Sequence, residues 1–189
     1  MPYEPFAPDR IESIDDATAA FRYCSAEELR TYLDPGPNWR VADFGSGTGL
    51  FTSELAPVAG TVYAVDVRPS MQAVFREKGT PANVEPVVAD FTALPFPDDH
   101  LDGAVSLRTY HHDFPPALPE VARVLRPGGR LAIVDWSGTG AGERETPVDE
   151  DYFDLATVQS HLLDAGFRIE EARERRETFV VVGSLRSDS

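Results

Sequence analysis

Val41-Ala42-Asp43-Phe44-Gly45-Ser46-Gly47-Thr48-Gly49 is an apolar run that leads into three alternating glycines, and the helix-compatible stretch 50–55 follows it. Glycine brings no Cβ and tolerates positive φ, so the backbone can bend sharply and lie directly against a ligand at the helix N-terminus. A strand, a glycine turn and a helix in this order are typical of nucleotide-binding α/β folds. Glycine triplets also occur in purely structural turns, so the prediction depends on the residues that follow.

Two acidic residues follow the next two apolar runs. Asp66 ends the run 61–66, 17 residues after Gly49, and a carboxylate at this place can accept both hydroxyls of a ribose. Asp90 and Phe91 come directly after the run 84–89, where an adenine could be hydrogen-bonded and stacked. Asp90 could equally cap a helix or a turn. The spacing also fits a nicotinamide cofactor, so these residues predict nucleotide binding without deciding which nucleotide.

Short β-branched runs alternate with helical stretches along the whole chain, which predicts an α/β fold with a mostly parallel, doubly wound sheet covered on both faces. Strands are expected at 40–44, 61–66, 84–89, 102–107, 130–135, 167–171 and 178–184. Helices are expected at 49–56, 69–78, 118–126 and 154–165, with Pro127-Gly128-Gly129 as a stop and Gly166 as a left-handed C-cap. The stretch 90–101 contains two prolines and is expected to be a loop.

The chain of 189 residues has the size of one domain, in which residues 1–36 form an N-terminal helical cap and residues 37–189 the α/β core. Residues 11–33 look helical, and Ser25 followed by Glu28 has the spacing of a capping box. Such a segment could close over a substrate, with Tyr3, Phe6, Phe21 and Tyr23 in the pocket wall; the alternative is that these side chains are simply part of the core.

The charge of the chain limits its partners. Acidic residues outnumber basic ones 32 to 17 and the net charge is −15, which argues against nucleic acid, because lysine and arginine must displace the counterions of that polyanion. Of the 17 basic residues only Lys78 is a lysine, so the acidic surface is consistent with adaptation to concentrated salt; codon bias in an ordinary acidic protein is the alternative.

The apolar runs are too short to cross a bilayer, and residues 1–5 lack the pattern of a signal peptide, so we expect a cytoplasmic protein without membrane insertion. Cys24 is the only cysteine, which excludes an internal disulfide and a cysteine-built zinc site. We expect a small-molecule substrate, and a homodimer as the form of any self-association.

With these features together, the sequence resembles the class I S-adenosylmethionine-dependent methyltransferases, particularly the methyltransferase type 11 group that includes small-molecule and quinone methylases. The matching segments, in order along the chain, are Asp43-Phe-Gly45-Ser-Gly47-Thr-Gly49, Asp66-Val-Arg-Pro-Ser70-Met71, Asp90-Phe-Thr-Ala-Leu94-Pro95-Phe96, Leu101-Asp102-Gly-Ala-Val-Ser-Leu107, Glu120-Val-Ala-Arg-Val-Leu125-Arg-Pro-Gly128-Gly129 and Ala165-Gly166-Phe167.

The resemblance implies a Rossmann-like seven-stranded sheet with the last strand antiparallel and S-adenosylmethionine as the cofactor. It places the glycine loop against the methionine part, Asp66 on the ribose and Asp90 beside the adenine. The cofactor-binding residues expected on this basis are Asp43, Gly45, Gly47, Gly49, Asp66, Val67, Asp90, Phe91 and Leu107. The reaction of the family is an in-line displacement on a sulfonium methyl group, which needs no metal and no covalent intermediate.

The loop after the fourth strand, Arg108-Thr109-Tyr110-His111-His112-Asp113, is where the acceptor would be handled. It lacks the Asn/Asp-Pro-Pro-Tyr signature of the nucleic-acid amino methylases. His111 or His112 could be a general base for a hydroxyl or enolic nucleophile. The alternative is a structural histidine pair, with Asp113 as the N-cap of the next helix.

Two other functions fit part of the pattern. A non-catalytic S-adenosylmethionine-binding partner of another methyltransferase would have the same loop. A nicotinamide-dependent oxidoreductase would share the loop and Asp66, but it would usually carry glycine in place of Leu50 and a hydride-transfer constellation that this chain lacks.

Overall fold

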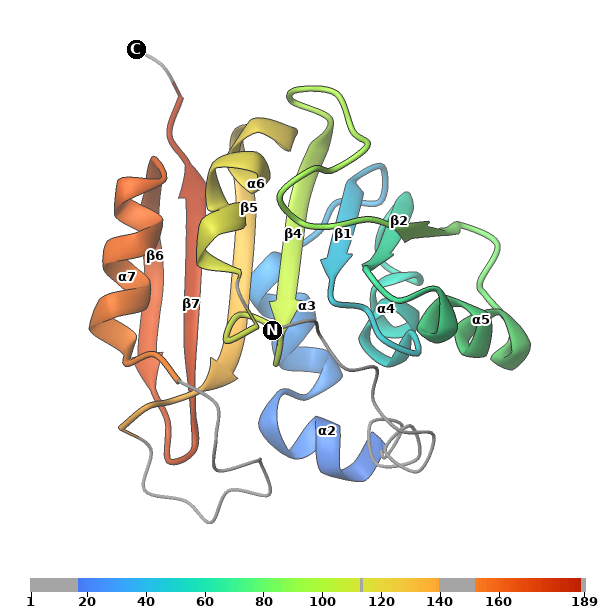
Figure 1. Cartoon of the computed structure of the whole chain (residues 1–189), viewed down its shortest axis with the longest axis horizontal. Helices are drawn as coiled ribbons and strands as arrows, with labels where there is room; N and C mark the ends of the chain where they lie inside the picture. Colours follow the sequence, from blue (N-terminus) through green and yellow to red (C-terminus); the bar gives the residue numbers. More distant parts are fainter. Residues whose placement is uncertain (1–16, 113, 140–151, 188–189) are drawn as a thin grey trace.

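Seven strands form one sheet in the order β3-β2-β1-β4-β5-β7-β6 in the computed structural model, which describes residues 17–112, 114–139 and 152–187 (Figure 1). The strands are β1 Arg40–Phe44, β2 Thr61–Asp66, β3 Val84–Val88, β4 Leu101–Leu107, β5 Leu125–Trp136, β6 Phe167–Glu174 and β7 Thr178–Leu185. The first five pair in parallel, and β7 runs antiparallel to both β5 and β6. The seven-stranded, doubly wound sheet with an antiparallel last strand is therefore confirmed.

The strand order reverses between β1 and β4. From β1 the chain builds outward through β2 to β3, and it then returns to place β4 on the other side of β1. The helices that follow β1 and β4, α4 (Leu50–Leu55) and α6 (Leu118–Val124), lie on opposite faces of the sheet, and open α/β sheets bind their ligands at such a point. The glycine loop follows β1 and the loop with His111 follows β4.

Alternate residues of the strands enter two separate cores, because successive side chains of a strand point to opposite faces of the sheet. Val41 and Val105 belong to the core that Leu33 and Leu55 cover, and Ala42 and Ala104 to the core on the opposite face. Strands buried on both sides are typical of parallel sheets and explain the continuous apolar runs in the sequence.

Helices cover both faces, with α6 and α7 on one and α3 on the other (Figure 1). Their bounds are α2 Ala17–Tyr23, α3 Ala26–Leu33, α4 Leu50–Leu55, α5 Pro69–Lys78, the 3₁₀ turn η1 Pro115–Ala117, α6 Leu118–Val124 and α7 Leu155–Asp164. The capping box is confirmed, since Ser25 N donates to Glu28 Oε2 at 3.0 Å and Glu28 N to Ser25 Oγ at 3.2 Å. In the ranges that the structure describes, no helix has the length and apolar character that crossing a membrane requires.

Most boundaries agree with the sequence prediction to within one residue, but the junction of α6 with β5 and the end of β6 differ by more. Helix α6 ends at Val124, and Pro127-Gly128-Gly129 lies within β5 instead of after the helix, because Leu125 is buried and pairs with Leu101 of β4. Strand β6 continues to Glu174, because its pairing with β7 extends to Phe179. The loop between β3 and β4 and the left-handed Gly166, with φ of 89°, are as predicted.

Candidate functional site

The three glycines after β1 all adopt left-handed backbone conformations, with φ of 78° at Gly45, 52° at Gly47 and 83° at Gly49. A Cβ on Gly49 would lie 2.2 Å from the ring of Phe75, and one on Gly45 would lie 2.2 Å from Thr109 Oγ1. Glycine is therefore required here for both conformation and space. The loop is a bare backbone turn that leads directly into α4.

Asp66 stabilises this loop. Its carboxylate is 2% exposed; Oδ2 accepts from Gly47 N at 2.9 Å, and Oδ1 accepts from Arg68 N at 2.9 Å and Arg68 Nε at 3.2 Å. A carboxylate has about four acceptor positions, so three are already used by the protein. The side chain predicted to meet a ribose thus has a second role, which the sequence did not indicate, in fixing the loop.

Gln72 supports the same loop from α5. Its side chain is fully buried, and its Nε2 donates to Ala64 O at 2.8 Å and to Ser46 Oγ at 3.3 Å. Sequence analysis did not single it out, because glutamine on a helix is usually exposed.

Asp43 lies beneath the loop and is buried among apolar neighbours. Thr52 Oγ1 donates to Asp43 Oδ2 at 2.6 Å. Burial raises the pKa of Asp43 from 3.8 to about 6, and the negative charge of Asp66 adds to the rise, while the hydrogen bonds from Thr52 oppose it. The group is therefore poised to titrate close to neutral pH.

The predicted adenine end of the site lies at the carboxyl ends of β2 and β3. Val67 is 50% exposed, and Phe91 packs on Phe44 and Phe114 with ring centroids 5.8 and 5.4 Å apart. Asp90 is exposed, and its Oδ1 accepts from Thr92 N and Thr92 Oγ1, which lowers the pKa of this carboxyl. Asp90 thus caps a turn, as the alternative interpretation held, and its Oδ2 remains available for a ligand.

The loop after β4 lies directly against the glycine loop. The approach of Thr109 to Gly45 brings the two into contact, and Leu107, the last residue of β4, is 7% exposed beside them. Thr109 Oγ1 donates to Leu107 O at 3.1 Å, and His112 N donates to Thr109 O at 3.0 Å, so 109–112 forms a tight turn. A side chain of this turn that points toward the glycine loop can therefore contact a ligand bound there.

His111 forms a buried pair with Asp135 at the end of β5. His111 Nδ1 lies 2.8 Å from Asp135 Oδ1, and Asp135 Oδ2 accepts from His111 N at 3.1 Å. The two side chains are 5% and 1% exposed. Asp135 also accepts from Trp136 N at 2.7 Å, which fixes the carboxylate. An aspartate bonded to Nδ1 favours the tautomer that carries its hydrogen on Nδ1.

His112 packs against His111 with the two rings tilted by 45° and their centroids 3.9 Å apart. Asp113, the predicted N-cap, lies outside the described residues. Across the described ranges, no three histidine, cysteine, aspartate or glutamate side chains converge as a metal site would require.

Aromatic side chains surround the His111–Asp135 pair. The ring of Tyr152 lies 5.2 Å from that of His111, and Tyr23 of α2 packs edge-on against Trp136 at 4.5 Å. Tyr23 therefore brings the N-terminal helices to this edge of the sheet. An aromatic wall beside a base favours a largely apolar acceptor.

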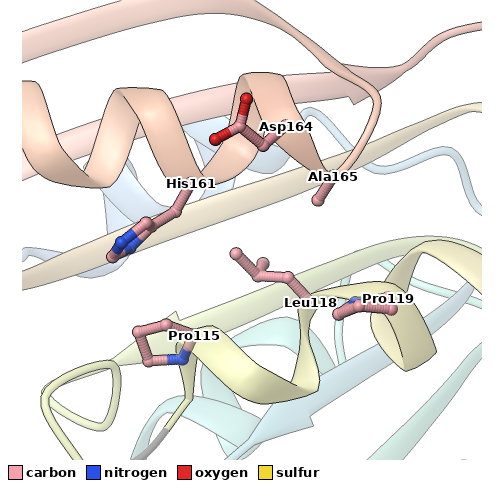
Figure 2. Close-up of a pocket in the computed structure, with 6 residues that line it drawn as sticks. All are labelled: Pro115, Leu118, Pro119, His161, Asp164 and Ala165. Atoms are coloured by element: carbon pink, nitrogen blue, oxygen red, sulfur yellow. The ribbon is translucent and has the colours of Figure 1, made fainter.

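Tyr110 anchors the loop 108–112 in the core on the face of the sheet that α6 and α7 cover. Its ring is fully buried, and its hydroxyl lies 3.0 Å from His161 Nδ1 on α7. His161 borders a cavity of about 250 Å³ between α7 and the η1–α6 segment (Figure 2). This cavity lies behind the loop rather than at the glycine turn, so we assign it no role in catalysis.

Asp135 is the main residue that the sequence analysis missed. Asp135 is the last residue of a predicted strand, as Asp66 is, and Asp90 directly follows another. The same reasoning about the carboxyl edge of a parallel sheet could therefore have identified Asp135. With the glycine loop and the acids of β2 and β3, the fold and site define a nucleotide-binding α/β protein.

Comparisons with known proteins show which proteins this chain resembles. Residues 42–133 match the model of a methyltransferase domain. The ubiquinone/menaquinone biosynthesis C-methyltransferase UbiE of Ectopseudomonas mendocina is 40% identical over 114 residues, which are 55% of this chain and 44% of that protein. The chain spans about half the length of the curated relatives it matches.

Solved structures agree with this match. A crystal structure of an S-adenosylmethionine-dependent methyltransferase from Aquifex aeolicus superposes with a TM-score of 0.80 at 28% identity, over 96% of this chain and 100% of that one. A chain from the complex between the Haloferax volcanii Trm112 methyltransferase activator and a putative methyltransferase has a TM-score of 0.81 at 20% identity, over 95% and 94%. The chain is thus similar to S-adenosylmethionine-dependent methyltransferases, by sequence over residues 42–133 and by fold over nearly its whole length, and S-adenosylmethionine is the cofactor that these matches indicate.

Proposed function

We propose that this chain transfers the methyl group of S-adenosylmethionine to a small-molecule acceptor held over the loop 108–112. The contact between Gly45 and Thr109 carries the proposal, because it sets the cofactor loop and the loop with His111 side by side. Groups that must react in line need this proximity.

The residues present fit the cofactor. Left-handed Gly45, Gly47 and Gly49 offer a backbone without side chains to the methionine part, with Asp43 beneath them. The remaining acceptor position of Asp66 suits the ribose. The cofactor supplies a methyl group on a sulfonium, whose departure as a neutral thioether needs no help from the protein.

The other cofactor contacts are proposed at the adenine end. Val67, Phe91 and Leu107 supply apolar surface, and the free Oδ2 of Asp90 can accept from an exocyclic amine. None of these contacts requires a side chain to move far.

His111 is the proposed general base. With Nδ1–H donated to Asp135, the lone pair of Nε2 can take a proton from the acceptor. The buried carboxylate then stabilises the imidazolium that forms. His112, whose ring packs against that of His111, is proposed to orient it.

The methylated atom of the acceptor stays a prediction. The UbiE relatives are named as C-methyltransferases, which makes a carbon atom next to an ionisable hydroxyl one candidate for the acceptor. The homodimer, the cytoplasmic location, the division into residues 1–36 and 37–189 and the exclusion of nucleic acid as substrate also stay predictions.

Calorimetry with S-adenosylhomocysteine and NAD, side by side, tests the cofactor. We expect only the first to bind. Asp90→Ala should weaken it by roughly 1–3 kcal/mol, the order for a lost hydrogen-bond partner. Asp90 is preferable to Asp66 here, because Asp66 also holds the loop.

Turnover distinguishes the enzyme from a non-catalytic partner. Formation of S-adenosylhomocysteine with a metabolite extract would support the enzyme. Tight binding without any turnover in extracts from several sources would support the partner instead.

A further inference from the structure

Arg108 is the first residue after β4 and occupies an unusual backbone conformation. Its φ is 54°, which side chains with a Cβ rarely adopt, and its N–H donates to Val134 O at 2.8 Å. That hydrogen bond continues the β4–β5 pairing and places Arg108 next to the position of Asp135. Strained backbone of this kind tends to occur at functional sites.

The guanidinium of Arg108 is partly buried without a partner. Its Nε is fully enclosed, and in the described part of the chain the group makes no hydrogen bond and no ion pair. Burial lowers the pKa of Arg108, while the nearby Asp135 and Tyr23 raise it. A buried guanidinium nitrogen without a hydrogen-bond partner is costly, and folded proteins seldom retain one without a use.

Asp135 stabilises this cation through its charge, but its oxygens are occupied by other hydrogen-bond donors. Asp135 already accepts from His111 Nδ1, His111 N and Trp136 N. These donors set the orientation of Asp135, and among the described residues no hydrogen bond joins its carboxylate to the Arg108 guanidinium. An arginine so placed has donors in a planar fork that matches an anionic oxygen.

We propose that Arg108 anchors an ionised oxygen of the methyl acceptor, so that the acceptor is an acid: a phenol, an enol or a carboxylic acid. This inference rests on the proposed function and specifies its substrate class. His111 would take the proton from the acceptor, and Arg108 would hold the oxygen that carries the resulting charge.

Binding of simple probes tests the proposal. The wild type, saturated with S-adenosylhomocysteine, is titrated with 4-nitrophenol and with benzoate, and with their uncharged counterparts 4-nitroanisole and benzamide. We expect at least one ionised probe to bind roughly 10- to 100-fold more tightly than its counterpart, the range for a hydrogen bond to a charged group. Which probe is preferred distinguishes a phenolate or enolate acceptor from a carboxylate.

Three variants assign the effect to Arg108. Arg108→Gln should remove the preference, Arg108→Lys should restore part of it, and Arg76→Gln, an exposed arginine on α5, should leave it unchanged. The wild type alone supplies a second readout, because its binding should shift 4-nitrophenol toward the coloured anion. This readout does not depend on whether the variants fold.

Two results would overturn the proposal: a wild type with no preference for either ionised probe, or a preference that Arg108→Gln retains. Both can be separated from failure of the proposed function. If S-adenosylhomocysteine itself does not bind, the methyltransferase assignment fails; if it binds and the probes show no charge preference, only the role of Arg108 fails.

Discussion

Asp43 combines burial with a pKa near neutrality, which gives it a measurable effect on stability. Its pKa is 3.8 in the unfolded chain and about 6 in the folded protein, so the folded state holds the proton more tightly. The stabilisation from this proton is complete below pH 4 and is lost as the pH rises through 6. Above that pH the ionised group costs on the order of 2–3 kcal/mol.

Asp43→Asn should therefore become more stable relative to the wild type as the pH rises from 5 to 8. Urea unfolding of the cofactor-free proteins at both pH values measures this, and the hydrogen bond with Thr52 can be kept by the amide. Parallel pH dependences of the two proteins would show that Asp43 does not titrate in this range.

Asp135 determines which nitrogen of His111 carries the proton. Asp135→Asn should lower kcat by about 10²- to 10⁴-fold, the range for loss of general-base catalysis, and should move the pH profile of kcat. Its affinity for S-adenosylhomocysteine should change little, because Asp135 does not touch the glycine loop. Steady-state rates from pH 6 to 9 provide the measurement.

The control is Asp98→Asn, which removes an exposed acid paired with Arg123 in the loop before β4. It should leave kcat unchanged. Equal losses in the two variants, or an unchanged profile for Asp135→Asn, would contradict the role of the His111–Asp135 pair.

At the scale of elements, the glycine loop and α4 depend on space as well as on backbone conformation. Gly49 and Gly79 both have positive φ, of 83° and 96°. A Cβ at Gly49 would meet Phe75 at 2.2 Å, while nothing lies within 4 Å of one at Gly79. Gly79→Ala should cost about 1–2 kcal/mol from backbone strain, and Gly49→Ala about 1–3 kcal/mol more from overpacking.

Thermal or urea unfolding measures both glycine variants. We also expect Gly49→Ala to weaken S-adenosylhomocysteine binding and Gly79→Ala to leave it intact. If the two substitutions cost the same, the contact with Phe75 does not constrain the loop.

The N-terminal helices are held by the β6–β7 turn. Arg175 donates to Tyr23 O at 2.7 Å and bonds to Glu28 and Tyr32 of α3, and Arg22 pairs with Glu177 at 2.9 Å. Burial alone would raise the pKa of Glu28, but the Ser25 N–H and Arg175 outweigh it and lower that pKa. The helices are thus attached through charged side chains rather than by apolar packing alone.

Arg175→Gln should loosen α2 and α3 specifically. Hydrogen exchange in residues 17–33 should speed up by roughly tenfold, the equivalent of one lost charged hydrogen bond, while the sheet stays protected. Arg168→Gln, an exposed arginine on the same β6–β7 hairpin, serves as the control. Exchange that is equally fast in both variants would mean that Arg175 does not hold the helices.

For the whole molecule, the net charge of −15 predicts a response to salt. Added ions screen repulsion among the excess acids, and this outweighs the weakening of exposed pairs such as Arg123–Asp98. We expect the Tm to rise as KCl approaches molar concentration. A Tm that stays flat or falls would rule out adaptation to high salt and favour codon bias as the reason for the single lysine.

The sequence by itself determined the elements and the cofactor end of the site. The short apolar β-branched runs, the glycines at 45, 47 and 49 and the acids at 66 and 90 are local signals, because each follows from the backbone that one short segment must adopt. These signals predicted β1, β2 and α5 to the residue.

Only the tertiary structure decided which side chains meet at the acceptor end. His111 and Asp135 are 24 residues apart, and their contact depends on the register in which Leu107 pairs with Val134. The same register leaves the buried Nε of Arg108 without a hydrogen-bond partner among the described residues. The packing of α7 brings His161 to the hydroxyl of Tyr110. Such pairings arise from how strands and helices pack on one another, and no periodicity within a single segment encodes them.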